Sequence, residues 1–258
     1  MVLLQKNGQS VKVDKGELVG YQVEDHEFIH QKGSPGWRNS DTEMFPIIGP
    51  TAEADFKVHT PKGEAIQDQH GLLRELEYEL LESTEALAVF SKKYKSGTPV
   101  ANSKFPTKST AKTLFWPYDF SFTKRFELFE DALEISFEIE GDLGMPFMLG
   151  YHPAFKLYGE DASVVAGDRS ISLAEVLAVG SRALQVPDCS GILLKDKKQL
   201  KISTSGFGNF MLWTEVSNMV CIEPITFYPY SVSQENLNQG FQKLETAKAE
   251  FKVVITPK

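Results

Sequence analysis

Apolar and polar residues alternate along the first part of the chain. Val11 and Val13 stand before an Asp-Lys-Gly turn, and Val19, Tyr21 and Val23 follow it. A period of two places successive side chains on opposite faces of a β-strand. Two such runs joined by a short turn predict a β-hairpin close to the N-terminus.

The same alternation returns in later segments. Residues 126–128 and 133–139 alternate on either side of an acidic turn, and residues 251–255 alternate near the end of the chain. Residues 200–215 hold two apolar runs joined by a Gly-Phe-Gly-Asn bend, whereas only residues 173–177 have the spacing of a short helical turn. Many short strands with frequent turns and few helical patterns predict an all-β fold, a large antiparallel β-sandwich.

Other segments complete the predicted organisation. Residues 44–50 are expected to form a buried strand closed by a turn, and residues 147–149 a short buried strand beside Gly150, which leaves room for another backbone. Residues 92–109 are rich in Lys, Ser, Pro and Gly and predict an exposed excursion between strands. Because strand patterning resumes after that excursion without a change in composition, residues 1–258 are predicted to form a single domain.

Charge and cysteine content narrow the classes of function. The formal net charge is −8 and lysines are interleaved with acids, so a nucleic-acid partner is not expected. Cys189 and Cys221 have no spacing typical of a disulfide framework or a metal knuckle, and they predict two inert buried thiols in a reducing interior. No segment has the character of a signal peptide or the length of a membrane span, so a cytoplasmic protein without a membrane partner is expected.

Two titratable residues follow apolar runs and precede proline. His152 stands at the exit of the run at 147–149 and before Pro153, and Glu223 follows Val-Cys-Ile and precedes Pro224. A residue before proline is restricted to extended geometry, which limits the directions its side chain takes. Either residue alone is more simply explained as a satisfied polar group near the core. Together they indicate a constructed site.

A third histidine and a loop add candidate binding groups. His70 lies in a polar turn before Leu72, where a histidine is usually solvated unless partners in space make it a binding group. Residues 30–39 form a loop rich in Gly and Pro that carries Trp37 and Arg38. This tryptophan is either part of a lid packed on the core, the more frequent case, or a platform on which a sugar stacks, with Arg38 supplying donors.

An acid and a base held together suit the opening of a cyclic sugar. If His70, His152 and Glu223 converge, a base removes the proton of the anomeric hydroxyl while an acid protonates the ring oxygen, and reclosure on the other face inverts the anomeric centre. Positioned acid and base groups each contribute roughly 10²–10⁴-fold. Burial of Glu223 would raise its pKa toward the working pH, and an ionised neighbour would keep His152 protonated. Such a reaction needs no cofactor.

Other chemistries fit the sequence less well. The two histidines and the carboxylate lack the His-x-His or His-Glu-x-x-His spacing of strong metal motifs, so no metal is expected. The chain has no Gly-x-Ser-x-Gly nucleophile elbow and no glycine-rich phosphate loop. Glu215 and Glu223 flank one strand and turn, which leaves glycoside hydrolysis as a minor alternative.

Five segments together resemble the aldose 1-epimerases, or galactose mutarotases, particularly their shorter bacterial branch that includes hexose-6-phosphate epimerases. In chain order these segments are 44–49, 69–74, 115–118, 149–155 and 220–224. The resemblance implies the galactose mutarotase-like supersandwich, with few short helices and a sugar site on a concave face. It also implies a cofactor-independent enzyme that interconverts the α and β anomers of a hexose or a hexose phosphate.

The resemblance assigns roles to four residues. Glu223 is expected to act as the general base and His152 as the general acid toward the ring oxygen. His70 is expected to bind the substrate, and Arg74 matches an arginine often seen after that His-Gly pair.

One position departs from the family pattern. Relatives usually have an arginine directly after the Phe-Pro-x-x-Gly segment, where it contacts the sugar, and this chain has Pro50 there. Proline has no side-chain donor, so Arg38 from the preceding loop is a candidate to reach the same region. Arg38, Arg74 and nearby lysines are also candidates to hold a phosphate. The alternative is a catalytically degenerate carbohydrate-binding or regulatory module on the same fold.

Overall fold

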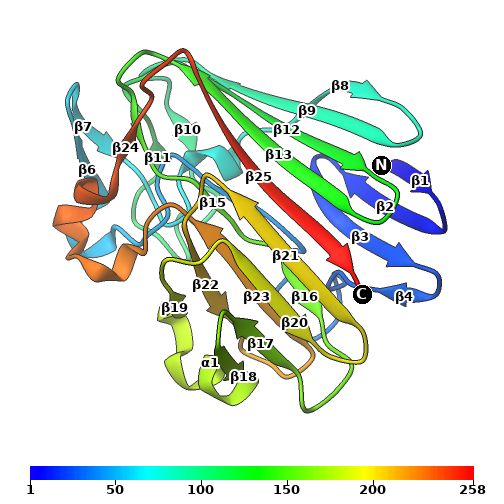
Figure 1. Ribbon diagram of the computed structural model, residues 1–258. Coiled ribbons are helices and arrows are strands. Elements are labelled where there is room, and N and C mark those ends of the chain that lie inside the picture. The colour runs from blue at the N-terminus through cyan, green and yellow to red at the C-terminus, as the bar shows by residue number, and fades with distance from the viewer.

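The computed structural model describes all 258 residues and confirms the predicted all-β antiparallel sandwich (Figure 1). The larger sheet has its strands in the order β18-β17-β20-β21-β25-β13-β12-β9-β8. The bounds of these strands are β8 Glu79–Ser83, β9 Leu87–Tyr94, β12 Phe120–Leu128, β13 Leu133–Gly141, β17 Ser163–Ala166, β18 Arg169–Ser172, β20 Gly191–Lys195, β21 Gln199–Ser205 and β25 Lys248–Pro257. In Figure 1 the red strand β25 runs through the middle of this sheet.

The second large sheet carries the candidate site. Its strands lie in the order β19-β22-β23-β15-β5, and β16 also pairs with β23. Their bounds are β5 Glu43–Met44, β15 Gly150–Tyr151, β16 Ala154–Lys156, β19 Leu184–Val186, β22 Asn209–Trp213 and β23 Met219–Ile225. Neighbouring strands in both sheets are antiparallel.

Smaller elements surround the two large sheets. A four-stranded sheet consists of β1 Val2–Lys6, β2 Gln9–Asp14, β3 Glu17–Val23 and β4 His26–Glu27. Three two-stranded pairs are β6 Lys57–Thr60 with β7 Gly63–Ile66, β10 Val100–Ala101 with β11 Thr113–Leu114, and β14 Pro146–Phe147 with β24 Gln242–Lys243. The helical elements are α1 Leu173–Val179 and the 3-10 turns η1 Ala52–Ala54, η2 Leu72–Glu75, η3 Gly180–Arg182, η4 Pro229–Ser231 and η5 Gln234–Gly240.

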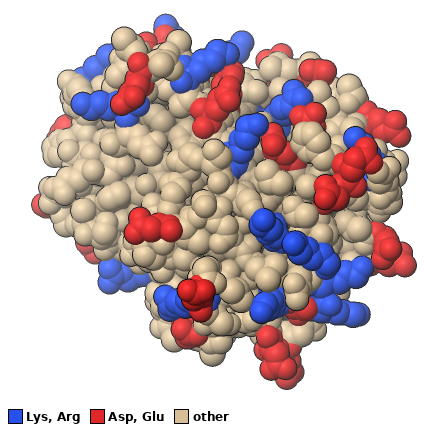
Figure 2. All heavy atoms as spheres, in the orientation of Figure 1, with Lys and Arg blue, Asp and Glu red and all other residues tan.

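Most of the elements predicted from alternation are confirmed. β2 and β3 form the N-terminal hairpin, and β12 and β13 pair along their whole length around the acidic turn. The short helix α1 begins with a capping box, in which Ser172 and Glu175 satisfy each other's backbone amides. None of the helices is long and apolar enough to cross a membrane. On the face shown in Figure 2, most basic side chains lie among acidic ones, and one row of basic side chains runs from the centre toward the lower right.

Two predicted buried strands are shorter than expected. Within residues 44–50 only Met44 belongs to a strand, and the rest is buried but irregular, because Pro46 and Pro50 have no amide proton to contribute to a ladder. Of residues 147–149 only Phe147 belongs to a strand, β14, and β15 begins after them at Gly150. The amide of Met148 donates to the carbonyl of Pro46 at 2.8 Å instead of to a neighbouring strand.

One continuous core lies between the two large sheets. It contains 59 buried apolar residues drawn from both sheets and from the N-terminal hairpin, and the only other buried apolar cluster consists of Ala154, Met219 and Cys221. Within this core the ring centroids of Phe137 in β13 and Tyr151 in β15 are 5.1 Å apart. The organisation of residues 1–258 as one domain stays a prediction, and this continuous core is consistent with it.

A buried lysine joins the two sheets. Lys124 lies on the inward face of β12 and is fully buried, and its Nζ is 2.7 Å from a carboxylate oxygen of Asp41 and 2.5 Å from one of Glu43. The hydroxyl of Tyr151 donates to Asp41 at 2.7 Å. Because the two carboxylates lie on either side of Thr42, they fix the backbone of the segment that borders the candidate site. Sequence reasoning missed this cluster.

Candidate active site

The register of one strand brings His152 and Glu223 together. β23 pairs with β15 at Gly150 and Ile225 and with β16 at Ala154 and Cys221. Counting two residues inward from each pair places His152 opposite Glu223. Their closest side-chain atoms, His152 Nε2 and Glu223 Oε1, are 3.3 Å apart. Directly opposed residues on neighbouring antiparallel strands have their side chains within reach of each other, so the backbone itself determines this proximity.

The position of Glu223 differs from the predicted one. The sequence placed this residue at the end of an apolar strand, but β23 continues through Pro224 to Ile225. The extended geometry required before a proline is that of a strand, so Pro224 does not end it. His152, in contrast, lies in the gap between β15 and β16, and its backbone exchanges hydrogen bonds with Thr42 in both directions, at 2.8 and 3.2 Å.

Both reactive groups line one cleft of about 710 Å³. All six residues predicted for the site line it: Trp37, Arg38, His70, Arg74, His152 and Glu223. The fold therefore brings together every candidate that the sequence proposed. Sequence reasoning missed several other lining residues, which include Thr42, Gln69, Lys104, Lys108, Ser181, Met211, Trp213 and Tyr230.

Aromatic rings hold the imidazole of His152 in place. Trp37 stacks on it with ring centroids 4.3 Å apart and an interplanar angle of 30°, and His70 meets it edge-on at 5.6 Å. The loop that carries Trp37 is itself fixed, because His30 Nε2 donates to the carbonyl of Trp37 at 2.9 Å. Trp37 thus packs against the catalytic candidate, which is closer to the predicted lid than to a free sugar platform.

The backbone at His70 is in an uncommon conformation. His70 has φ of 76° and the following Gly71 has φ of 72°. A Cβ on Gly71 would lie 2.2 Å from the carbonyl oxygen of Phe45, so only glycine fits there. His70 is held by its amide, which donates to Ile48 at 3.2 Å. Non-glycine residues at positive φ cost free energy and are concentrated at functional sites.

Burial changes the protonation of the pair. It lowers the pKa of His152 to about 3 and raises the pKa of Glu223 well above its usual value. Burial also lowers the pKa of His70, with a smaller contribution from neighbouring positive charge. Nδ1 of His152 and Nδ1 of His70 are both buried without a hydrogen-bond partner. Burial therefore favours the uncharged form of both groups, a neutral imidazole and a protonated carboxyl.

Comparison with known proteins identifies the family of the chain. The family model for aldose 1-epimerase matches residues 16–202. The chain belongs to the aldose 1-epimerase family. A galactose mutarotase related enzyme from Lactobacillus acidophilus is 18% identical, with a TM-score of 0.76 over 99% of this chain and 96% of the other.

Two further solved structures share the fold of this family member. A galactose mutarotase-like protein from Lactobacillus casei is 14% identical, with a TM-score of 0.81 over the full length of both chains. A galactose mutarotase-like protein from Clostridium acetobutylicum is 12% identical, with a TM-score of 0.71 over 99% of this chain and 94% of the other. No curated protein matches the chain. Family and fold together support an aldose epimerase type of activity, which is an isomerase activity on small sugars.

Positive charge gathers at the cleft of this aldose 1-epimerase family member. Arg38, Arg74, Lys104 and Lys108 all line it, whereas Pro50, at the position of the usual family arginine, does not. The two lysines come from the segment that was predicted only as an exposed excursion. Its high lysine content was the available signal. Arg74 pairs with Glu75 at 3.5 Å and Lys104 with Asp68 at 2.9 Å. Arg38 and Lys108 are therefore the cleft cations without a carboxylate partner, in a chain whose net charge is −8.

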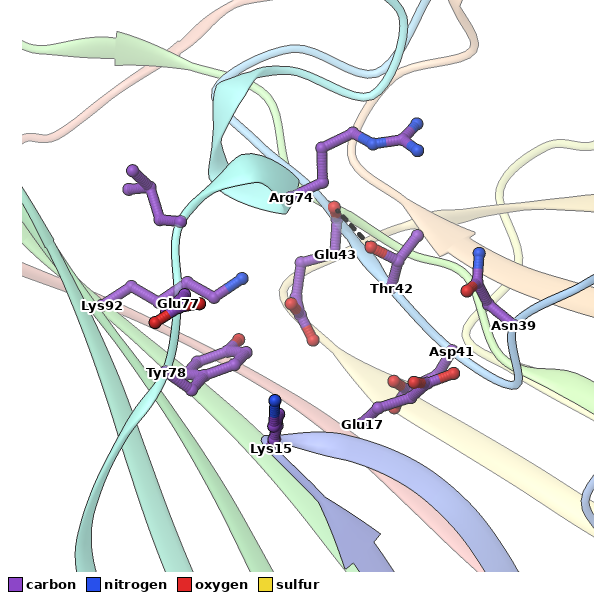
Figure 3. Close-up of a pocket in the computed structure, with 12 residues that line it drawn as sticks. Lys15, Glu17, Asn39, Asp41, Thr42, Glu43, Arg74, Glu77, Tyr78 and Lys92 are labelled. Atoms are coloured by element: carbon purple, nitrogen blue, oxygen red, sulfur yellow. Dashed lines mark hydrogen bonds between the residues drawn. The ribbon is translucent and has the colours of Figure 1, made fainter. Parts of the chain in front are cut away.

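A smaller pocket adjoins the cleft (Figure 3). It has a volume of about 400 Å³ and shares Asn39, Thr42 and Arg74 with the main cleft. In Figure 3 the side chain of Arg74 extends away from Tyr78 and Lys92, which lie on the other side of this pocket. The side pocket therefore ends at the buried cluster around Lys124 and not at the reactive pair.

Proposed function

We propose that the protein interconverts the α and β anomers of a hexose, or of a hexose phosphate, without a cofactor. The observation that carries this proposal is the 3.3 Å approach of His152 Nε2 and Glu223 Oε1 on the wall of an open cleft. An acid and a base at this separation reach two oxygens bonded to the same carbon, as the ring oxygen and the anomeric hydroxyl are.

Ring opening uses both groups at once. The carboxylate of Glu223 takes the proton of the anomeric hydroxyl, the bond between the anomeric carbon and the ring oxygen breaks, and the imidazolium of His152 gives its proton to the ring oxygen. Rotation of the aldehyde exposes its other face. Reclosure then reverses both transfers, because the ring hydroxyl returns its proton to His152 and Glu223 protonates the new anomeric oxygen.

The cycle begins with transfer of the shared proton from Glu223 to His152, whose closest side-chain atoms are 3.3 Å apart. Ring opening leaves a neutral imidazole and a protonated carboxyl, which is the form that burial favours. The dry environment therefore promotes the proton transfers that open the ring. The pair carries one shared proton throughout, so activity should fall in acid, where a second proton is added, and in alkali, where the shared proton is lost, giving a bell-shaped profile of kcat/KM against pH.

The remaining residues orient the sugar. His70 and Arg74 offer donors from the turn that begins η2, and Arg38 offers donors from the opposite loop. Trp37 keeps the imidazole of His152 in one orientation. The four cationic side chains favour a substrate that carries an anionic group, since arginine forms paired hydrogen bonds with phosphate.

Anomerisation of freshly dissolved sugar tests the mechanism. Optical rotation or NMR of α-glucose and α-galactose is followed with the wild type, Glu223→Gln and His152→Asn. Each substitution should lower kcat/KM by about 10²-fold or more, because each removes one proton-transfer group. Glu215→Gln is the matched control, since Glu215 lines the same cleft but is exposed and is not part of the pair. Equal rates for the wild type and Glu223→Gln would contradict the mechanism.

A sugar-binding module without catalysis is the second candidate. It is favoured by Pro50, which leaves the usual family arginine without a direct replacement. Calorimetric titration with sugars separates the two functions, because saturable binding with no acceleration of anomerisation would identify the module.

A parallel series identifies the substrate. Hexoses and hexose 6-phosphates are compared on the wild type, Arg74→Gln and Arg38→Gln. If the basic cleft holds a phosphate, both substitutions should raise KM for the phosphorylated sugar more than for the neutral one. Arg125→Gln is the control, because Arg125 pairs with Glu127 away from the cleft.

A further inference from the structure

The reactive pair has a third buried neighbour. Cys221 lies two residues before Glu223 on β23, so both side chains point to the same face of that strand. One ligand atom from each of His152, Cys221 and Glu223 lies within 4.8 Å of the other two. All three residues are buried, with exposed fractions of 6%, 0% and 1%. Sequence reasoning treated this cysteine as an inert thiol.

The lone pairs of this cluster are poorly satisfied. The carboxylate of Glu223 has His152 as its ion-pair partner and no other, and the thiol of Cys221 makes no hydrogen bond, whereas that of Cys189 donates to Gly191 at 3.1 Å. The surroundings are apolar, because Cys221 packs with Ala154 and Met219. A buried set of acceptors without donors is a set of potential ligands.

The three ligand types select the cation. An imidazole nitrogen, a thiolate sulfur and a carboxylate oxygen are the ligands of Zn²⁺, which is bound by three protein groups and a water in open sites. Sulfur disfavours Mg²⁺ and Ca²⁺, which prefer oxygen ligands. The cleft that His152 and Glu223 line leaves room for a water as the fourth ligand.

We propose that His152, Cys221 and Glu223 form a site for a thiophilic divalent cation, Zn²⁺ or Cd²⁺, and that the cation competes with the sugar. On binding, the thiol of Cys221 and the carboxyl of Glu223 lose their protons to solvent, and the cation takes one lone pair from each of the three side chains. The ion is an inhibitor and not a cofactor, because the acid and the base are then no longer available. The inhibitory consequence rests on the proposed function, whereas binding of the cation does not.

Affinity should be moderate. Histidine ligands usually donate their second nitrogen to a fixed acceptor, and loss of such a partner lowers metal affinity about 10–100-fold. Nδ1 of His152 is buried with no partner, so the ring receives no such support. This distinguishes the site from a permanent structural zinc site.

Titration with Cd²⁺ tests binding without reference to activity. The wild type should show ultraviolet thiolate-to-cadmium charge-transfer absorption that saturates at one equivalent and disappears when Zn²⁺ is added. Cys221→Ser should abolish the absorption, and Cys189→Ser, which alters the other cysteine, should retain it. Glu223→Gln should keep the absorption but weaken Cd²⁺ binding at least about tenfold. Thermal melting of each variant verifies that it is folded.

Two results would overturn the proposal. One is absorption that persists in Cys221→Ser, and the other is Cd²⁺ affinity unchanged in Glu223→Gln and His152→Asn. Inhibition is measured separately, as the Zn²⁺ sensitivity of each protein relative to its own rate without metal. Zn²⁺ should inhibit the wild type and spare Cys221→Ser, and Mg²⁺ should inhibit neither. If the wild type does not accelerate anomerisation, the absorption titration alone still decides the metal site.

Discussion

Two groups of buried titratable residues lie close to Thr42, and they differ in how many hydrogen-bond and ion-pair partners they have. Lys124 has two carboxylate partners and a fully enclosed position between the sheets. His152 and Glu223 have mainly each other, and they border an open cleft. The polar atoms around Lys124 bind one another and stabilise the fold, whereas those of His152 and Glu223 remain available to bind a ligand.

The same contrast appears in their protonation. Burial opposes the charge of Lys124, but Asp41 and Glu43 outweigh it and raise its pKa above the usual value. No comparable partner compensates His152 and Glu223, so burial alone moves both toward the uncharged form. Lys124 therefore keeps its charge in the folded protein. His152 and Glu223 lack such compensation, so their protonation can change during a reaction.

The largest effect on stability is expected from Lys124→Met. Removal of one partner leaves Asp41 and Glu43 buried and uncompensated, so the free energy of unfolding should fall by about 3–5 kcal/mol. Urea unfolding measures it. The control is Lys252→Met, which breaks an exposed pair with Glu134 and should cost at most about 1 kcal/mol. An equal loss of unfolding free energy in the two variants would contradict the view that the buried cluster stabilises the fold more than an exposed ion pair does.

A triple variant separates the effect of charge in this cluster from the effect of its hydrogen-bond geometry. In Lys124→Met combined with Asp41→Asn and Glu43→Gln, no charge remains in the cluster. This protein should recover part of the stability lost in the single variant, because the cost arises mainly from unpaired buried carboxylates. If the triple variant is no more stable than Lys124→Met, hydrogen-bond geometry and not charge accounts for the loss.

Glu223→Gln should change stability in the opposite direction. Because the folded pKa of Glu223 is raised, its contribution to stability is complete below the unfolded value of 4.5 and is lost as pH rises through the folded pKa. At pH 7 the variant should therefore be more stable, by about 0.5–2 kcal/mol, as is common when a functional group is removed. Melting temperatures measured from pH 4.5 upward should diverge, whereas those of Glu215→Gln should follow the wild type.

His152→Asn tests the other half of the pair. The folded pKa of His152 is about 3 and the unfolded value is 6.5, so the wild type should lose stability as pH falls from 6.5 toward 3. His152→Asn should not show the decrease in stability that arises from protonation of His152. Parallel stability curves for the two proteins over this range would show that His152 does not titrate as a buried neutral group.

The smallest effect is expected from Trp37. Contacts between stacked rings contribute about 0.5–1.5 kcal/mol, so Trp37→Leu should lower kcat/KM for anomerisation roughly threefold to tenfold. Trp37→Phe keeps an aromatic ring against His152 and should retain most of the activity. If Trp37→Leu is fully active, Arg38 and the backbone alone position the loop.

Alternation was sufficient to predict the sandwich, and the resemblance named the site residues. Side chains with a period of two had to face one core, which is why the pairing of β12 with β13 followed from residues 126–139 alone. The sequence analysis expected His152 and Glu223 to converge, but the sequence did not show which strand pairing brings them together. It depends on the register of β23, a pairing between segments about seventy residues apart in the chain.

Other features escaped the sequence for physical reasons. Lys124 occupies an apolar position in the alternation of β12, and its partners Asp41 and Glu43 lie about eighty residues earlier. Local pattern carries no information on such a distant pair. The opposite error occurred at residues 44–50, where an apolar composition predicted a strand although two prolines prevent a continuous ladder.

The register of β23 separates two properties of the candidate site, the spacing of its reactive pair and the groups that surround the ligand. The spacing between His152 and Glu223 follows from main-chain pairing, while the groups proposed to bind the sugar come from segments 36–39, 69–74 and 104–108. Substitutions in those loops that keep Trp37 and His70 should change which carbohydrate is accepted without changing the main-chain pairing of His152 and Glu223. A single-residue insertion inside β23 would instead turn one of the two reactive side chains to the wrong face, so the loops and not the strand are the place to redesign specificity.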